Sequence, residues 1–378
     1  MTKIKQWIKE NENKILGYYD YLHAHPEVSA KEYETQKFLL NELKKLDFDI
    51  QTDPAHTGIL ATWQGKEPGK VVGLRADMDA LFQNVHGKWQ ANHSCGHDAH
   101  MTMALCAVMS LKKSDFELKK GTIQVLFQPA EEIGEGALAC LKSGFVDDMD
   151  YLLGVHLRPK VEVVMGKAAP AIYYGASAQF KCYVSGVQAH GARPHLGVNV
   201  VDAIASAVQA INAIRMNPVI PSSAKVTQMN AGNSINIIPD EGEFSIDIRS
   251  VDNDELERII KLVKKAVTNA VTANGSTVQM EEKAKMVATI PHKAMEEIVG
   301  AAIVDVLGEN GFVPPPITPG AEDFNFYTKM KPELQGTMIG LGCDLEPGLH
   351  SPDMTFNKKA ILNGVDIMAQ AVVRLLEN

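Results

Sequence analysis

The sequence lacks the marks of a membrane or secreted protein. None of its hydrophobic runs approaches the roughly 20 residues that a membrane-spanning helix needs. Residues 1–12 are polar and rich in lysine, without the apolar segment of a secretory signal. The five cysteines are odd in number and widely scattered, so we expect no disulfide framework; they are Cys95, Cys106, Cys140, Cys182 and Cys343. These absences together favour a reducing, cytoplasmic location.

Basic stretches, internal repeats and low-complexity segments are also missing. The formal net charge is −9 and no run of lysine and arginine offsets it, which argues against nucleic acid or an anionic membrane as a partner. Hydrophobic residues make up 45% and charged residues 22%, so disordered and fibrous classes are excluded. A chain of 378 residues exceeds the size of most single cores, and we expect more than one domain.

Helical and strand-like patterns alternate along the first part of the chain. Apolar spacing predicts one helix over residues 3–24, which Pro26 ends. A second helix follows to about residue 46, and Ser29 with Glu32 forms a predicted capping box at its start. Further along we expect a helix at 100–112 and strands at 58–64, 70–75, 121–128 and 151–156. Such alternation predicts an α/β domain with helices on both faces of a sheet.

The middle of the chain changes to another pattern. We expect helices at 199–217 and 252–273, the second capped by Asp252 or Asn253, and strands at 177–187, 225–230, 235–250 and 277–283. The order β-α-β-β-α-β is that of a small ferredoxin-like sandwich. The α/β pattern then resumes with elements near 293–308, 336–341 and 358–376. The sequence therefore predicts an α/β domain over 1–172 and 286–378, with an inserted α+β domain over 173–285.

The densest group of chemically versatile side chains is the segment Cys95–His100. One glycine separates Cys95 from His97, so that both side chains can turn toward one metal ion. Thiolate and imidazole, together with carboxylate, are the ligands of a zinc-like ion. The alternative is a loop with a buried free cysteine and surface histidines, and this motif alone does not decide between the two.

Acidic residues follow two of the predicted strands. Glu131 and Glu132 come directly after an apolar run, and adjacent carboxylates at such a place are costly to bury without a cation. One of them can bind metal while the other acts as general base on a metal-bound water. Asp77 and Asp79 follow another strand and could orient an imidazole ligand. An exposed loop and a turn or helix cap are the respective structural alternatives.

Two histidines extend the set of possible ligands. His156 ends an apolar run and His350 lies in a turn-rich loop, and either one alone is more often a structural residue than a ligand. With Cys95, His97 and Glu132 they make five ligand-type groups at strand ends or in loops of one predicted domain. Five such groups and a spare carboxylate suit two ions about 3.5–4 Å apart, whereas a closed structural zinc site uses four ligands.

These motifs, in this order, resemble the amidohydrolase branch of the aminoacylase/carboxypeptidase family of dinuclear metallopeptidases. That branch includes hippurate hydrolases, auxin–amino acid conjugate hydrolases and N-acetyl-diaminopimelate deacetylases. The resemblance covers nearly the whole chain and rests on Leu22–Glu27, Arg75–Leu81, Cys95–His100, Gln128–Glu132, Ala189–Gly191, Asn236–Pro239, Gly320–Phe324 and His350. It implies a mixed-sheet, zinc-exopeptidase-like catalytic domain, with the inserted ferredoxin-like domain serving as lid and dimerisation domain.

The resemblance also implies a division of roles. Two divalent ions, zinc or manganese with cobalt or nickel as further candidates, would be held by five residues: a bridging Cys95, with His97, Glu132, His156 and His350. Glu131 would be the general base that forms a hydroxide between the ions and passes its proton to the leaving amine. Asp79 would hydrogen-bond a metal-ligating side chain and so fix its orientation. The implied activity is hydrolysis of an N-acyl amino acid, with an N-acetyl or aromatic acyl group, to a carboxylate and a free amine.

Implied substrate contacts come from the inserted domain and from a segment after it. His190 would reach the active site of a partner subunit in a homodimer and stabilise the oxyanion. Asn236 and Arg249 are candidates for binding the substrate carboxylate, which the guanidinium fork suits. Glu322 is a candidate for binding the substrate amine or for a structural role. A surface histidine and a solvated strand residue are the structural alternatives for His190 and Arg249.

Two other functions compete with this hypothesis. A dipeptidase or carboxypeptidase of the same family usually carries aspartate in place of Cys95, so the cysteine favours the amidohydrolase branch. A non-catalytic binding relative would be expected to have lost ligands or the base, and the sequence retains all of them. The segment Ala80–Ser94, which contains Trp89 and Asn92, is a shorter and rewritten loop compared with most relatives. Because this loop lies next to the ligand motif and differs from that of most relatives, the resemblance does not identify the substrate.

Overall fold

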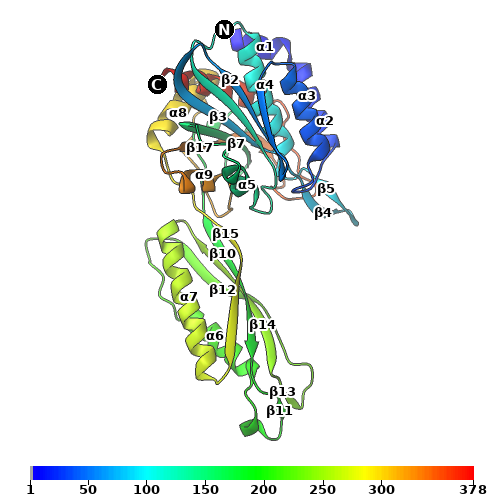
Figure 1. Ribbon diagram of the computed structural model, residues 1–378, viewed down its shortest axis with the longest axis vertical. Coiled ribbons are helices and arrows are strands. Elements are labelled where there is room, and N and C mark those ends of the chain that lie inside the picture. The colour runs from blue at the N-terminus through cyan, green and yellow to red at the C-terminus, as the bar shows by residue number, and fades with distance from the viewer. Residues whose placement is uncertain (1–2) are drawn as a thin grey trace. The chain divides into compact units, whose positions relative to one another are not determined.

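The computed structural model describes residues 3–378, which form two compact units. The first unit contains the described residues up to Tyr173, together with Ile290–Ile317 and Asp323–Asn378. The second unit contains Tyr174–Thr289 and Thr318–Glu322. Figure 1 shows the elements of each unit. Within residues 3–378, no helix combines the length and the apolar character needed to cross a membrane.

The first unit is built on a mixed sheet. Seven strands of the described chain pair in the order β1-β2-β6-β3-β7-β17-β8. Strands β6, β3, β7 and β17 run parallel, and β1, β2 and β8 join through antiparallel pairings. The bounds are β1 (Asp49–Asp53), β2 (His56–Gln64), β3 (Glu67–Asp77), β6 (Lys120–Gln128), β7 (Tyr151–Pro159), β8 (Ala168–Ala169) and β17 (Gln335–Leu345). The predicted α/β class with a mixed sheet is confirmed.

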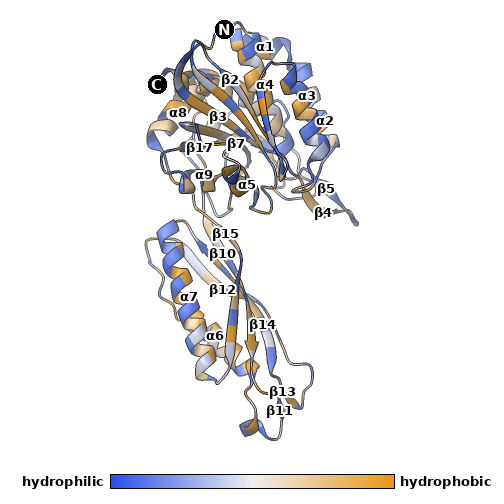
Figure 2. Ribbon diagram, in the orientation of Figure 1, coloured by the Kyte–Doolittle hydropathy of each residue, from blue (hydrophilic) through white to orange (hydrophobic). Residues whose placement is uncertain are grey.

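Helices cover both faces of this sheet, as predicted. α4 packs on one face with α8, α10 and the N-terminal helices, and α5 and α9 pack together on the other. Every residue of α4 from His97 to Leu111 is buried, and hydrophobic residues are concentrated on this helix and on the central strands (Figure 2). The bounds are α1 (Lys3–Glu10), α2 (Glu12–Ala24), α3 (Tyr33–Lys44), α4 (His97–Lys113), α5 (Gly136–Lys142), α8 (Lys293–Leu307), α9 (Asn325–Met330), α10 (Ala360–Glu377) and a 3-10 turn at Glu309–Gly311.

Several helix boundaries differ from those predicted; the helix expected at 199–217, for example, ends at Asn212. The helix expected over residues 3–24 is divided at Asn11 into α1 and α2. The Asn11 side-chain amide donates to the Trp7 carbonyl oxygen at 2.9 Å, and such a bond competes with the helical backbone. The helix expected at 100–112 begins earlier, at His97, which places a predicted ligand in its first turn.

The predicted capping box at the start of α3 is wrong. Neither Ser29 nor Glu32 has its side chain at the helix N-terminus. The carboxylate of Glu27 takes that place and accepts hydrogen bonds from the backbone N–H groups of Thr35 at 2.8 Å and Glu34 at 3.2 Å. The Ser29 and Glu32 side chains are therefore available for other contacts.

The second unit contains a four-stranded antiparallel sheet in the order β12-β14-β10-β15, with α6 and α7 along one face (Figure 1). The first and third strands in the chain lie in the middle, which confirms the predicted ferredoxin-like topology. Asp252 caps α7 by accepting from Glu255 N at 2.8 Å. The bounds are β10 (Ala176–Ser185), α6 (Val200–Asn212), β12 (Ser222–Ala231), β14 (Glu241–Ser250), α7 (Asn253–Ala273) and β15 (Thr277–Met286).

The strand predicted over residues 235–250 is two strands. Its first part, β13 (Ile237–Ile238), leaves the main sheet and pairs with β11 (Ala189–His190), followed by a 3-10 turn at Pro194–Leu196. The remaining short strands are β4 (Leu81–Val85), β5 (Lys88–Asn92), β9 (Tyr173–Tyr174) and β16 (Ile317–Thr318).

Candidate metal centre

The predicted ligands of the first unit gather at the carboxyl ends of its parallel strands. β3 ends at Asp77, β6 ends at Gln128 just before the two glutamates, and His156 lies near the end of β7. The chain enters α4 at His97 beside these ends. Because parallel strands end at one edge of a sheet, side chains far apart in sequence meet there.

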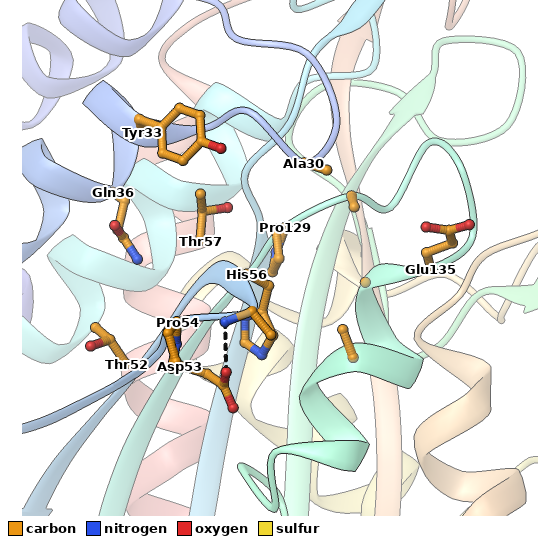
Figure 3. A pocket seen from close by; sticks show the side chains of 14 residues that line it. Ala30, Tyr33, Gln36, Thr52, Asp53, Pro54, His56, Thr57, Pro129 and Glu135 are labelled. Carbon is orange, nitrogen blue, oxygen red and sulfur yellow. Dashed lines mark hydrogen bonds between the residues drawn. The ribbon is translucent and has the colours of Figure 1, made fainter.

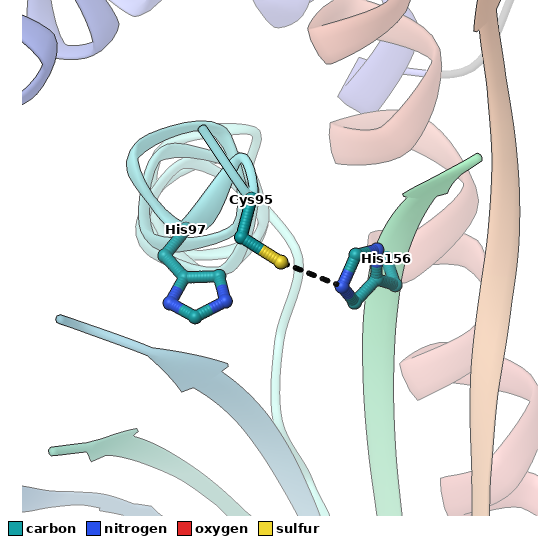
Figure 4. Close-up of side chains that lie close together, drawn as sticks. All are labelled: Cys95, His97 and His156. Atoms are coloured by element: carbon teal, nitrogen blue, oxygen red, sulfur yellow. Dashed lines mark hydrogen bonds between the residues drawn. The ribbon is translucent and has the colours of Figure 1, made fainter. Parts of the chain in front are cut away.

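Cys95, His97 and His156 form one group of three buried ligand-type side chains. Their donor atoms all lie within 4.8 Å of one another. The Cys95 sulfur is 3.5 Å from His156 Nε2, and the His97 ring lies beside it at the start of α4 (Figure 4). Gly96 between them has φ +93°, a left-handed conformation that a side chain disfavours, and a Cβ there would lie 2.9 Å from Leu157 Cδ1. Glycine thus allows the sharp turn that aims both side chains at one point.

Cys95 also belongs to a second group, with Glu132 and His350. These donor atoms again lie within 4.8 Å of one another, and Glu132 Oε2 is 3.5 Å from His350 Nε2. His350 has φ +63°, and its backbone N–H donates to Ser94 O at 2.7 Å. All five residues predicted as ligands therefore lie together in two groups that share the Cys95 sulfur. Their role as ligands stays a prediction.

Asp79 connects several residues of this cluster through hydrogen bonds. His97 Nδ1 donates to the Asp79 carbonyl oxygen at 2.9 Å and lies 3.3 Å from its carboxylate, which leaves His97 Nε2 facing the cluster. The same carboxylate accepts from Ser29 Oγ at 2.6 Å and from the backbone N–H groups of Glu131 and Glu132 at 3.2 and 3.0 Å. Burial alone would raise the pKa of Asp79, but these hydrogen bonds, that of His97 foremost, lower it. Asp79 is placed where it can orient His97, and its predicted role stays a prediction.

His100 is adjacent to the ligand motif but has both ring nitrogens engaged. Nδ1 donates to Asp77 Oδ1 at 2.7 Å, and Nε2 accepts from Leu157 N at 3.1 Å. Asp77 in turn accepts from Arg75 at 2.6 Å, and Arg75 also donates to Asp323 at 2.8 Å. The sequence predicted that Asp77 could orient an imidazole, but it did not predict the contacts of Arg75 with Asp77 and Asp323. Arg75 and Asp77 lie at i, i+2 on one face of the strand, a spacing that is compatible with their contact.

The cluster has the electrostatic character of a site for cations. In the part of the chain that the structure describes, His97 Nε2 and Glu132 Oε1 are buried without a hydrogen-bond partner. Burial raises the pKa of Glu132 to about 7 and raises that of the Cys95 thiol well above its usual range. A divalent cation reverses both effects, because it favours the thiolate and the carboxylate. Thiolate, imidazole and carboxylate donors together fit zinc-like ions.

Glu131, the predicted general base, is buried directly beside the ligand groups. Its Oε2 lies 3.9 Å from His97 Nε2, and His97, Glu131 and Glu132 place one donor atom each within 4.8 Å. The side chain therefore lies within reach of a reactant held at the cluster, although its catalytic role stays a prediction.

The residues predicted for substrate contacts lie in the second unit. His190 is exposed on β11, and the neighbouring Gly191 N donates to Asn236 O at 2.7 Å, so the loops of His190 and Asn236 lie together. His190 Nδ1 accepts from Ala192 N at 3.0 Å, which leaves Nε2–H as a donor. The Arg249 guanidinium donates to Asp247 at 2.9 Å on the same strand, an arrangement that agrees with the structural alternative.

Glu322 is the last residue of the second unit and is buried. It directly precedes Asp323, whose carboxylate accepts from the Gln128 side-chain amide at 2.8 Å and from Ala137 N at 2.9 Å in the first unit. Its predicted role is neither supported nor opposed by these contacts.

The rewritten segment Ala80–Ser94 is a β-hairpin, where the sequence suggested a loop. β4 and β5 pair through residues 81–92, with Phe82 and Trp89 stacked and exposed. On its other face, Gln83 Nε2 donates to His350 O at 3.2 Å. The hairpin thus contacts the loop that carries a candidate ligand.

A pocket of about 490 Å³ lies on the first unit, apart from the ligand groups (Figure 3). His56, Asp53, Pro129 and Glu135 are among its lining residues, and none of the five candidate ligands is. The cluster at the strand ends contains buried ligand-type atoms without hydrogen-bond partners among residues 3–378, so it is a stronger candidate for the functional site than this cavity.

Asp79→Asn is expected to weaken metal binding about 10- to 100-fold, because the amide no longer accepts from all four donors that Asp79 now orients. Isothermal titration of the metal-free protein with manganese measures the effect. Asp49→Asn, on an exposed position of β1, is the matched control. Unchanged affinity in the Asp79 variant would contradict the orienting role.

A mixed α/β sheet whose strand ends bring together a thiolate, imidazoles and carboxylates is the architecture of a metal-dependent hydrolase. The chain belongs to peptidase family M20/M25/M40, whose model matches residues 73–374. Within that family it is a metal-dependent amidohydrolase of the aminoacylase branch. The family predicted from the motifs is confirmed.

Relatives of known name span nearly the whole chain. N-acetyl-L-cysteine deacetylase of Bacillus subtilis (strain 168) is 30% identical over 97% of this chain and 89% of that protein. IAA-amino acid hydrolase ILR1-like 4 of Arabidopsis thaliana is 27% identical over 96% and 86%. The crystal structure of a provisionally assigned aminohydrolase from methicillin-resistant Staphylococcus aureus matches with TM-score 0.89 and 27% identity, over 99% of each chain.

Proposed function

We propose that this protein hydrolyses the amide of N-acyl amino acids with an N-acetyl or aromatic acyl group, using two divalent ions that Cys95, His97, Glu132, His156 and His350 would hold. The observation that carries the proposal is the pair of ligand groups around one sulfur, with the carboxylate of Glu131 beside them. The relatives named above, a deacetylase and an amino acid conjugate hydrolase, support this class of substrate.

Glu131 is the residue that moves protons in this proposal. When bound, divalent ions supply Lewis acidity, which polarises the amide carbonyl and lowers the pKa of water. Glu131 takes the proton from the attacking water and gives it to the nitrogen of the leaving amino acid. Asp79 keeps His97 and the backbone of Glu131 and Glu132 in place during this transfer.

The oxyanion of the tetrahedral intermediate is stabilised by His190 of the partner subunit in a homodimer. The Nε2–H tautomer that Ala192 N favours makes His190 a donor suited to this task. Asn236, from the loop beside it, contributes to binding the substrate carboxylate. Arg249 is a weaker candidate because Asp247 already binds its guanidinium.

A mixing experiment tests the shared site. His190→Ala and Glu131→Gln chains, each inactive alone, are expected to regain activity when unfolded together and refolded as mixed dimers, since one complete site then forms. Hydrolysis by the mixture is compared with that by each variant refolded separately. A mixture no more active than the two separately refolded variants together would contradict the proposal that His190 acts in the active site of the partner subunit.

Carboxypeptidase activity is the second candidate. Thermostable carboxypeptidase 2 of Saccharolobus solfataricus is 30% identical over 88% of this chain and 88% of that protein. We expect N-acetyl or N-benzoyl amino acids to be cleaved with higher kcat/KM than dipeptides in a screen with added manganese, zinc, cobalt or nickel. Faster cleavage of dipeptides would assign the carboxypeptidase function instead.

A further inference from the structure

Glu32, predicted from sequence to cap a helix, is a fully buried carboxylate that contacts the loop of Glu131 and Glu132. Its Oε1 accepts from Ala30 N and Ala130 N, each at 2.9 Å, and its Oε2 accepts from Thr57 Oγ1 at 2.5 Å. Burial raises the pKa of Glu32, which shows that this position is costly for a carboxylate. It makes no side-chain bond to the N-terminus of α3. A helix cap therefore does not account for its burial.

Ala130 has an unusual backbone conformation for a residue with a side chain. Its φ is +54°, in the left-handed region that costs a non-glycine residue free energy. Its N–H is held by Glu32 and its carbonyl oxygen accepts from Gly136 N at 3.1 Å. A Cβ on Gly136 would lie 1.7 Å from Pro129 O, so the loop closes tightly. The strained turn immediately precedes Glu131 and Glu132.

Three successive backbone N–H groups in this turn are held by two buried carboxylates. Ala130 N donates to Glu32, and the N–H groups of Glu131 and Glu132 donate to Asp79. Asp79 also touches the ligand His97, whereas the hydrogen bonds of Glu32 go to Ala30, Thr57 and Ala130. The two carboxylates thus bind successive N–H groups of the same turn.

We propose that Glu32 is a positioning residue for catalysis: by accepting the Ala130 N–H it holds the left-handed turn that aims Glu131 at the reacting water and Glu132 at the cluster. The inference rests on the proposed function for its kinetic part. Glu32 also affects metal binding, because it places Glu132. The effect on metal affinity can be measured without any substrate turnover.

The test compares Glu32→Ala, Glu32→Gln, Ala130→Gly and the double variant Glu32→Ala/Ala130→Gly. In Glu32→Ala, the turn loses the acceptor that offsets its strain, and we expect kcat to fall about 5- to 30-fold, with manganese affinity reduced and KM little changed. Glutamine keeps an oxygen for both N–H groups, so Glu32→Gln should stay within about threefold of the wild type. Glycine adopts the left-handed conformation without strain, so Ala130→Gly should raise kcat in the Glu32→Ala background and leave it nearly unchanged alone.

Glu27→Ala is the matched control, since that carboxylate also accepts two backbone N–H groups but only at the start of α3. It should lower the Tm without changing kcat or manganese affinity. Glu32→Ala with a lowered Tm but unchanged kcat and manganese affinity, or no rescue by Ala130→Gly, would overturn the proposal. If the enzyme proves to act on another amide, the manganese titrations of the same variants still decide the positioning role.

Discussion

Glu131→Gln is expected to lose nearly all turnover, about 10²- to 10⁴-fold in kcat, while keeping its metal ions. Glutamine has the same shape but cannot take a proton at neutral pH. The backbone N–H of residue 131 still donates to Asp79, so the turn and the neighbouring Glu132 should stay in place. Initial rates on the best N-acyl amino acid and elemental analysis of the same preparation measure both effects.

Glu135→Gln is the control for Glu131→Gln, because Glu135 is an exposed carboxylate of the same loop outside the ligand groups. It should retain wild-type kcat and metal content. Full activity in the Glu131 variant would contradict its role as general base. Loss of metal together with activity would instead assign Glu131 to the ligands.

Cys95→Ala is expected to lower the affinity for both ions, because Cys95 belongs to both ligand groups. His156→Ala, by contrast, removes a donor from one group and should spare the other. Elemental analysis after gel filtration, and manganese titration of the metal-free variants, distinguish the two patterns. The expected metal content is near zero for Cys95→Ala and between zero and the wild-type value for His156→Ala.

Cys106→Ala provides the control, since this buried cysteine lies in α4, the helix that follows Cys95, and outside the ligand groups. Its metal content should equal that of the wild type. A Cys95 variant that keeps one tightly bound ion would show that the sulfur is not shared, and the two groups would then be independent sites.

The ligand cluster was predictable because strand ends carry their own signals. Apolar runs that stop at Asp77, at Gln128 and near His156 show where the sheet ends, and parallel strands bring such ends together. The ferredoxin-like unit was predictable for a similar reason, since the order of its strands and helices fixes the topology.

The long-range partners of Ser29 and Glu32 were not predictable from local patterns. Ser29 and Glu32 match the spacing of a capping box, but their partners, Asp79 and Ala130, lie far along the chain. Local spacing describes contacts within one turn of helix, and long-range hydrogen bonds leave no such period. The hydrogen bond from Gln83 in the hairpin to the His350 carbonyl oxygen is also long-range, and it was not predictable for the same reason.

The central claim is that two ions, held around one sulfur, are needed for amide hydrolysis. Titrating chelator-treated protein with manganese, while bound metal and hydrolysis of an N-acetyl or N-benzoyl amino acid are followed together, tests it directly. The account predicts saturation at two ions per chain and full activity only as the second ion binds. Saturation at one ion, or hydrolysis by the metal-free protein, would contradict it.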